Sequence, residues 1–185
     1  MHIRITPLEA RPDEAMAQVE QQPGLISAYV MRPMDQQQPL LVSVWRTVED
    51  ADLTAVTAGG LAFSHGEFVG SGSVDESPAY GQIVYFDGPR PQIESDAIDR
   101  ANRDRIGPAV RDIPGNLGAF VGRNAEGSFV VVALTASLQA IEDSQRAIMS
   151  TELLPGEDPA DLVGPDRMQL AWVLATSSQT APLPV

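Results

Sequence analysis

The chain has 185 residues, a formal net charge of −13 at pH 7 and no cysteine. This length fits one compact domain or two small fused ones. The lack of cysteine excludes a disulfide framework, a thiol nucleophile and cysteine-ligated zinc. All 12 basic residues are arginine, which excludes a lysine Schiff base and a P-loop lysine. The 25 acidic residues outnumber them, which argues against nucleic acid or an anionic membrane as the partner.

No apolar run approaches the roughly 18 residues that a membrane span needs, and the N-terminal residues lack the apolar core of a signal peptide. We therefore expect a cytoplasmic protein with no membrane partner. The hydrophobic share of 43% is that of an ordinary globular protein.

The first half of the chain is predicted to run strand, helix, strand, strand, helix. Alternating apolar residues indicate the first strand, Pro12 suits the first turn of the helix, and Pro23-Gly24 ends it. A polar turn separates the two strands that follow. The expected ranges in chain order are 2–7, 12–22, 25–32, 40–47 and 48–56.

An internal repeat organises the sequence. Residues 23–32 (PGLISAYVMR) match residues 114–123 (PGNLGAFVGR) at an offset of 91 (114 − 23). The next apolar runs end at Thr47 and Thr135, which are 88 residues apart (135 − 47). Because the match preserves the order of all neighbouring elements, we infer a duplication.

The second half accordingly repeats the pattern with a longer first helix. The expected ranges are a strand at 82–86, a helix at 94–112, strands ending at 123 and spanning 128–135, a helix at 137–149 and a strand at 168–174. We therefore predict an α+β fold of two ferredoxin-like βαββαβ units with antiparallel sheets that form an intramolecular pseudo-dimeric barrel. The expected units are 1–78, with a glycine-rich linker, and 79–175, followed by a disordered tail at 176–185. The roles of the glycine-rich segment 57–80 and of the Pro/Gly/acid loop 152–166 are left open.

The repeat carries a resemblance to a known family. The Pro-Gly segment leading to Ala28 and Tyr29, together with the strand ending Val44-Trp45-Arg46-Thr47 before an acidic helix start, resembles the dimeric α+β barrel superfamily, which contains the antibiotic-biosynthesis monooxygenases. The resemblance covers residues 2–56 well and 82–175 in outline. In that superfamily two sheets pack face to face as a dimer, and here one chain supplies both.

The resemblance implies two chemistries for a pocket. Cofactor-free members oxidise electron-rich aromatic substrates held by a few polar groups, and some haem-degrading members bind iron through a histidine. The ligand-pocket candidates are Tyr29, Trp45, Arg46, His65, Asn102 and Asn116, with Arg103 beside them. Each also has a structural interpretation: core packing for Trp45 and Trp172, a loop position for His65, and solvent-facing or hairpin-end positions for the others.

The repeat also pairs two arginines. Arg32 and Arg123 end equivalent strands, so they are either matched anion clamps or strand-end salt bridges. With 25 carboxylates as potential partners, the salt bridge is favoured.

We expect a protein that binds a small organic molecule on this scaffold without requiring catalysis. The alternatives are a cofactor-independent monooxygenase that oxidises an electron-rich aromatic substrate, and a protein that binds or degrades haem. The sequence leaves open whether the protein is an enzyme and whether two chains form a homodimer. Apart from haem, we expect no cofactor, and with two histidines and no cysteine we expect no metal site.

Overall fold

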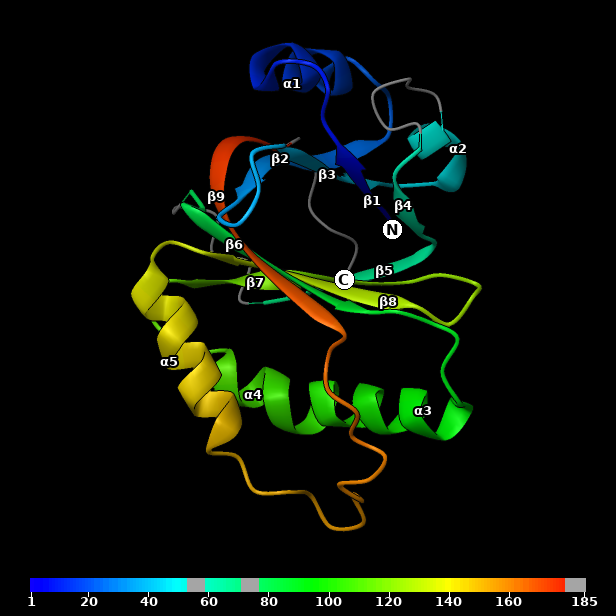
Figure 1. Cartoon of the computed structure of the whole chain (residues 1–185), viewed down its shortest axis with the longest axis vertical. Coiled ribbons are helices and arrows are strands. Elements are labelled where there is room, and N and C mark those ends of the chain that lie inside the picture. The colour runs from blue at the N-terminus through cyan, green and yellow to red at the C-terminus, as the bar shows by residue number, and fades with distance from the viewer. Residues whose placement is uncertain (53–58, 71–76, 179–185) are drawn as a thin grey trace.

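The computed structural model describes residues 1–52, 59–70 and 77–178 (Figure 1). Its strands are β1 (His2–Pro7), β2 (Leu25–Pro33), β3 (Leu40–Trp45), β4 (Leu61–Phe63), β5 (His65–Val69), β6 (Tyr80–Phe86), β7 (Asn116–Arg123), β8 (Phe129–Thr135) and β9 (Arg167–Ser178). Its helices are α1 (Pro12–Glu20), α2 (Val48–Asp52), α3 (Gln92–Ala101), the π-helical turn η2 (Asn102–Ile106), α4 (Gly107–Val110) and α5 (Leu138–Met149). None of the helices in these ranges is both long and apolar enough to cross a membrane.

The described strands form one antiparallel sheet that closes into a barrel. Their order is β4-β1-β3-β2-β9-β6-β8-β7-β5. The two ends of this order are consecutive in the chain, because only Ser64 separates β4 from β5. The amide of Gly66 also donates a hydrogen bond of 2.8 Å to the carbonyl of Met1. Closure leaves the described strands without a long unpaired edge that could pair with another chain.

The strand order contains the same arrangement twice, β4-β1-β3-β2 and β9-β6-β8-β7. We call these the first and second unit. The two units are joined at both ends: β9 of the second unit pairs with β2 of the first, and β5, which follows β4 in the chain, pairs with β7 of the second. This confirms the predicted α+β fold of two ferredoxin-like units in one intramolecular barrel.

Local sequence explains why the repeat folds the same way twice. The glycine of each Pro-Gly pair has a positive φ, 78° at Gly24 and 80° at Gly115, a conformation that glycine adopts at little cost. Each glycine therefore turns the chain from the end of a helix into the second strand of its unit.

The boundaries differ from expectation mainly after β9. This strand continues to Ser178, so residues 176–178, expected in the disordered tail, are instead paired with β2. The reason is tertiary, since β9 pairs with the edge of β2 that β3 leaves open. Residues 179–185, and residues 53–58 and 71–76 of the expected second helix and linker, lie outside the described residues.

Candidate functional site

The barrel interior is a packed core. Side chains from both units meet there, and Tyr29 lies 6.0 Å from Phe120, its counterpart in the repeat (ring centroid distance). Burial raises the pKa of both Tyr29 and Tyr85. The Tyr85 hydroxyl donates to Oε1 of Gln169 at 3.0 Å. The interior therefore stabilises the barrel.

The layer between the helices and the sheet in the first unit is also closely packed. Trp45 lies on the helix side of β3, with 0% of its surface exposed, in a buried cluster with residues of α1 and β2. Its Nε1 donates to Oγ of Ser43 at 2.9 Å. This confirms the interpretation of Trp45 as a packing residue.

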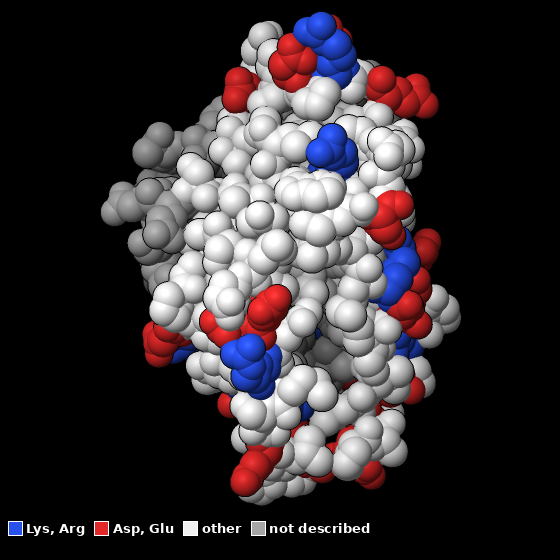
Figure 2. All heavy atoms as spheres, turned by 60° about the vertical axis from the view of Figure 1, so that its left-hand side comes forward, with Lys and Arg blue, Asp and Glu red and all other residues white. Residues whose placement is uncertain are grey.

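The same layer in the second unit is open. The strand register places Thr135 at the position of Trp45, because Trp45 pairs with Leu25 and Thr135 pairs with Asn116, 91 residues after Leu25 (116 − 25). No comparable buried cluster forms on this side among the described residues. Ala133, Val131 and Val84 face the helices yet remain partly exposed. Figure 2 shows a hollow on this side of the molecule. We call this space the interlayer cleft. Its floor includes Tyr80, Gln82, Val84, Val131, Ala133 and Leu170.

The strand register places five polar or aromatic side chains in one line at an edge of this floor. Arg32 pairs with Trp172, Trp172 with Tyr80, Tyr80 with Thr135, and Thr135 with Asn116. All five residues lie on the outer side of the barrel because their strand neighbours point into its core. We call this line the cross-strand row. It begins on the surface where the two units join and leads into the cleft.

Helices and an aromatic stack limit the cleft elsewhere. Ile98 and Ala101 of α3 and Ala140 and Ile141 of α5 are buried, so these helices contact the sheet there. Opposite the cross-strand row, the rings of Phe86 and Phe129 stack at 3.9 Å. Arg90 and Arg123 lie over their outer faces, 5.5 Å and 4.9 Å from the ring centroids. The cleft is therefore closed at that end.

A segment that we call the strap (residues 151–166) follows α5 and is tied to the helices. Nε of Arg105 lies 3.0 Å from Oε2 of Glu157, whose side chain is 1% exposed. Nη1 of Arg105 also donates to Oγ1 of Thr151 at 2.7 Å. Arg105 therefore holds the strap at two positions, Thr151 and Glu157.

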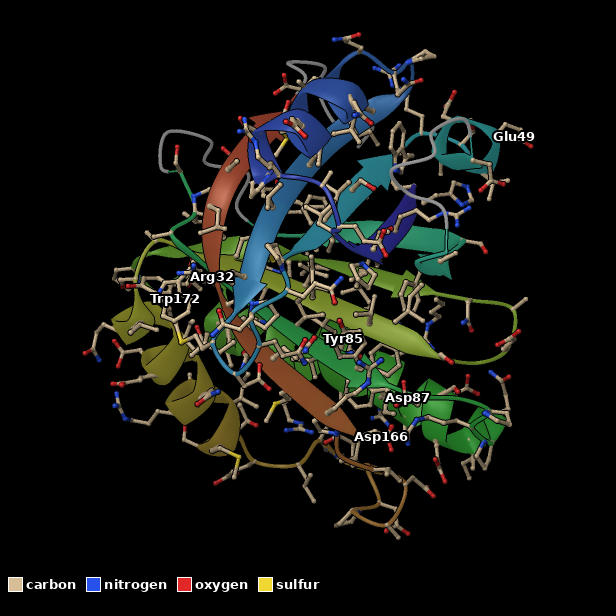
Figure 3. All side chains as sticks on the ribbon, turned by 45° about the horizontal axis from the view of Figure 1, so that its top comes forward. Arg32, Glu49, Tyr85, Asp87, Asp166 and Trp172 are labelled. Atoms are coloured by element: carbon tan, nitrogen blue, oxygen red, sulfur yellow. The ribbon has the colours of Figure 1, made fainter. Side chains whose placement is uncertain are left out.

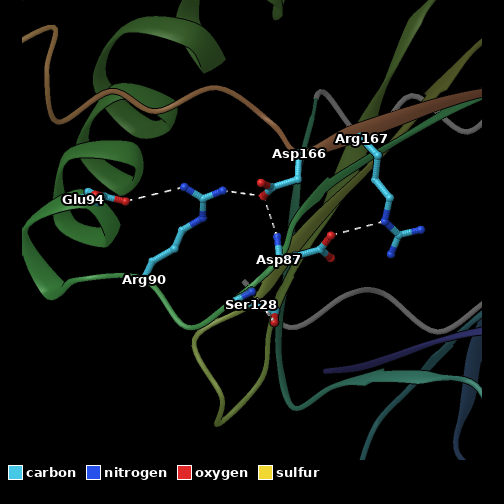
Figure 4. Close-up of polar contacts among 7 residues, drawn as sticks. Asp87, Arg90, Glu94, Ser128, Asp166 and Arg167 are labelled. Atoms are coloured by element: carbon cyan, nitrogen blue, oxygen red, sulfur yellow. Dashed lines mark hydrogen bonds and ion pairs between the residues drawn. The ribbon is translucent and has the colours of Figure 1, made fainter.

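The end of the strap is held by a second network (Figure 4). The Asp166 carboxylate accepts a 2.8 Å hydrogen bond from the amide of Asp87 and pairs with Arg90. Arg90 also pairs with Glu94, and Asp87 with Arg167. The hydrogen bond from the Asp87 amide, followed by the contact with Arg90, lowers the pKa of Asp166.

The structure disperses the side chains that the sequence singled out. Tyr29 is in the barrel, Trp45 is in the first unit's core, and Arg46 is exposed just beyond β3. The backbone of His65 pairs with that of Arg123, and its side chain lies outside the described residues. Arg103 is exposed and paired with Asp104.

Asn102 and Asn116 are the two candidates that border the second unit's helix layer. Asn102 begins η2 and is partly exposed. Asn116 belongs to the cross-strand row and lines a pocket of about 20 Å³ beside Gly107 and Val110, a volume that holds one water molecule. Its amide donates to the carbonyl of Val110 at 2.7 Å and accepts from the amide of Gly118 at 3.3 Å. Asn116 thus shapes the start of β7.

The expectation that Trp172 is a packing residue was wrong. Its side chain is 37% exposed, and Met168 on the same face of β9 is 57% exposed. The alternation of Met168, Leu170, Trp172 and Leu174 could have indicated one shared face. It could not show that α5 and the strap leave this face uncovered.

The charged groups around the cleft do not form a metal site. No cluster of three or more histidine and acidic side chains suited to a metal ion occurs among the described residues. The described floor and roof of the cleft also contain no histidine, so they provide no histidine ligand for haem iron.

The strand order and the strand pairs between the units define an α+β barrel of two ferredoxin-like units in one chain. Two solved structures share this fold and carry the name "putative monooxygenase". One, from Fusobacterium nucleatum subsp. nucleatum ATCC 25586, matches 96% of this chain and 93% of its own with a TM-score of 0.65 and 5% identity. The other, from Lactobacillus acidophilus NCFM, matches 96% and 94% with a TM-score of 0.56 and 9% identity. At sequence identities this low, the similarity shows a shared fold and nothing about function. No family model and no curated protein matches the sequence.

Proposed function

We propose that the protein binds a small, flat, largely apolar molecule in the interlayer cleft. The observation that carries this proposal is the difference between two copies of one fold. Trp45 fills this layer in the first unit, whereas the second unit has Thr135 at the matching position and leaves Ala133 and Val131 beside it partly exposed. Ligand sites are concave and mostly apolar, with a few polar groups at the edge, and the floor around Ala133 has this composition.

Binding accounts for the residues better than acid–base catalysis does. The arginines nearest the roof and closed end, Arg90, Arg105 and Arg123, are paired with carboxylates. Such pairs hold elements together and do not transfer protons to a ligand. The remaining polar groups of the floor are the Gln82 amide and the hydroxyls of Tyr80 and Thr135, which can orient a ligand.

Filling the cleft tests the proposal. In Ala133→Trp the indole should occupy the space above the cleft floor that the ligand needs. We expect the neutral fluorescent probe N-phenyl-1-naphthylamine to bind the unchanged protein, and A133W to lose at least about tenfold in affinity. The free energy of unfolding should stay within about 1 kcal/mol of the parent, because the added side chain enters open space.

Ala125→Trp provides the matched control. Ala125 lies in the exposed turn between β7 and β8, so A125W adds the same side chain without entering the cleft and should leave probe binding unchanged. If A133W binds the probe normally, the cleft is not the site. If A133W is destabilised by several kcal/mol, the layer is already full and the proposal fails.

A second candidate, oxidation of a bound aromatic molecule by oxygen, is favoured by the fold shared with the two proteins named as monooxygenases. Its test is oxygen uptake with an electron-rich hydroquinone. Uptake that A133W abolishes and A125W retains would support it, and no uptake above the buffer rate would reject it.

A further inference from the structure

Arg32, unlike Arg90, Arg105 and Arg123, has no carboxylate partner among residues 1–52, 59–70 and 77–178. Its counterpart in the repeat, Arg123, pairs with Asp99. Arg90, Arg105 and Arg167 pair with Asp166, Glu157 and Asp87. In a chain with 25 acidic residues, most arginines find a partner. The duplicated pair has therefore diverged: one member forms a salt bridge and the other keeps its charge available.

Arg32 is nevertheless held in place. Its guanidinium carbon lies 5.0 Å from the centroid of the Trp172 ring, a distance that gives a favourable cation–π contact. Figure 3 shows the two side chains together beside α5. Stacking leaves the N–H groups at the edge of the guanidinium plane free to donate hydrogen bonds. This arrangement suits a planar anion such as a carboxylate.

The neighbouring residues lead from this charge into the cleft. Tyr80 follows Trp172 in the cross-strand row, so two aromatic side chains lie side by side between Arg32 and the apolar floor. The next residue, Thr135, is 3% exposed, and its Oγ1 has no hydrogen-bond partner among the described residues. A buried hydroxyl without a partner is uncommon in a folded protein. It marks a buried polar position in the row, between Tyr80 and Asn116.

We propose that Arg32, Trp172 and Tyr80 form an anion-binding subsite at the mouth of the interlayer cleft. The ligand class is an aromatic anion: its apolar rings lie over the cleft floor and its carboxylate or sulfonate group accepts hydrogen bonds from Arg32. This inference rests on the proposed function and adds the ligand's charge and orientation. The net charge of −13 does not prevent it, because salt screens exposed charges beyond about 8–10 Å.

Two probes that differ by one group test the subsite. 8-Anilinonaphthalene-1-sulfonate carries the rings of N-phenyl-1-naphthylamine plus a sulfonate. Arg32→Gln should lower the affinity for the sulfonate probe about tenfold, the loss expected for one charge-assisted hydrogen bond, and change that for the neutral probe less than twofold. Arg32→Lys keeps the charge and should retain more affinity for the sulfonate probe than R32Q.

Arg11→Gln is the control for overall charge. Arg11 is exposed before α1 and paired with Asp13 and Glu14, so R11Q removes one positive charge far from the row and should leave both affinities unchanged. If R32Q weakens both probes equally, or neither, the subsite is wrong while the cleft remains. If R11Q matches R32Q, the effect is long-range and the subsite is also wrong. If neither probe binds the unchanged protein, the proposed function fails first.

Discussion

Replacing Trp45 with alanine should lower the free energy of unfolding by about 3–5 kcal/mol, the cost measured for removing fully buried tryptophan side chains. Trp45 justifies the full range, because its side chain is 0% exposed and fills the layer between β3 and α1. Its Nε1 also donates to Oγ of Ser43, so W45A leaves a buried hydroxyl without that partner. The loss is a large share of the 5–15 kcal/mol that usually stabilises a domain.

The assay is urea unfolding followed by far-ultraviolet circular dichroism, which does not depend on the deleted fluorophore. The units share β9 and the β4–β5 connection, so we expect one cooperative transition. For a chain of this size, about 3–5 kcal/mol corresponds to a fall in Tm of about 6–20 °C.

Trp172→Ala supplies the comparison. This side chain is 37% exposed, so W172A should cost about 1 kcal/mol. Equal losses in W45A and W172A, or a loss below about 1 kcal/mol in W45A, would refute the conclusion that the first unit's layer is solid and the second unit's is open.

Two further predictions concern the strap. Arg105→Ala leaves the carboxylate of Glu157, which is 1% exposed, without its cation and should lower the free energy of unfolding by about 3–5 kcal/mol, measured by urea unfolding. Arg103→Ala breaks the exposed pair with Asp104 on the same π-helical turn and should lower it by less than about 1 kcal/mol. Equal losses in the two variants would contradict the role of Arg105. The pKa of Asp166 is lowered by the Asp87 amide and then by Arg90, so its ionised form stabilises the fold at neutral pH, and this contribution is lost as the pH falls through the folded pKa. Asp166→Asn should therefore be less stable than the parent at pH 7, with a difference that narrows below about pH 4; a constant difference from pH 7 to pH 3 would show that the charge of Asp166 is not involved.

Much of the fold could be predicted because its signals are local. The Pro-Gly pairs, the alternating apolar residues of β1 and the polar turns between strands depend on backbone conformation and on one buried face. The repeat then determined the architecture, since two identical units with apolar sheet faces must cover each other. The extension of β9 to Ser178 could not be predicted in this way, because its partner β2 lies more than 140 residues earlier in the chain.

The candidate site was less predictable, because each of its residues, taken alone, fits an ordinary structural role. Asn116 was identified, whereas Trp172 was assigned to packing and Tyr80 and Thr135 were not considered. These residues meet only because β7, β8, β6 and β9 are neighbours in the sheet with a particular register. A register shift of one residue would turn each side chain to the other face of its strand.

By itself the sequence determined that the chain contains two related units, since this follows from comparing the chain with itself. The tertiary structure alone decided that Thr135 takes the position of Trp45, through the strand register, and what that replacement means. Whether a missing indole leaves a cleft depends on how closely α3, α5 and the strap approach the sheet, and whether Arg32 keeps its charge available depends on which carboxylates come near it. Both are distances between segments far apart in the chain, and no local pattern of residues encodes them.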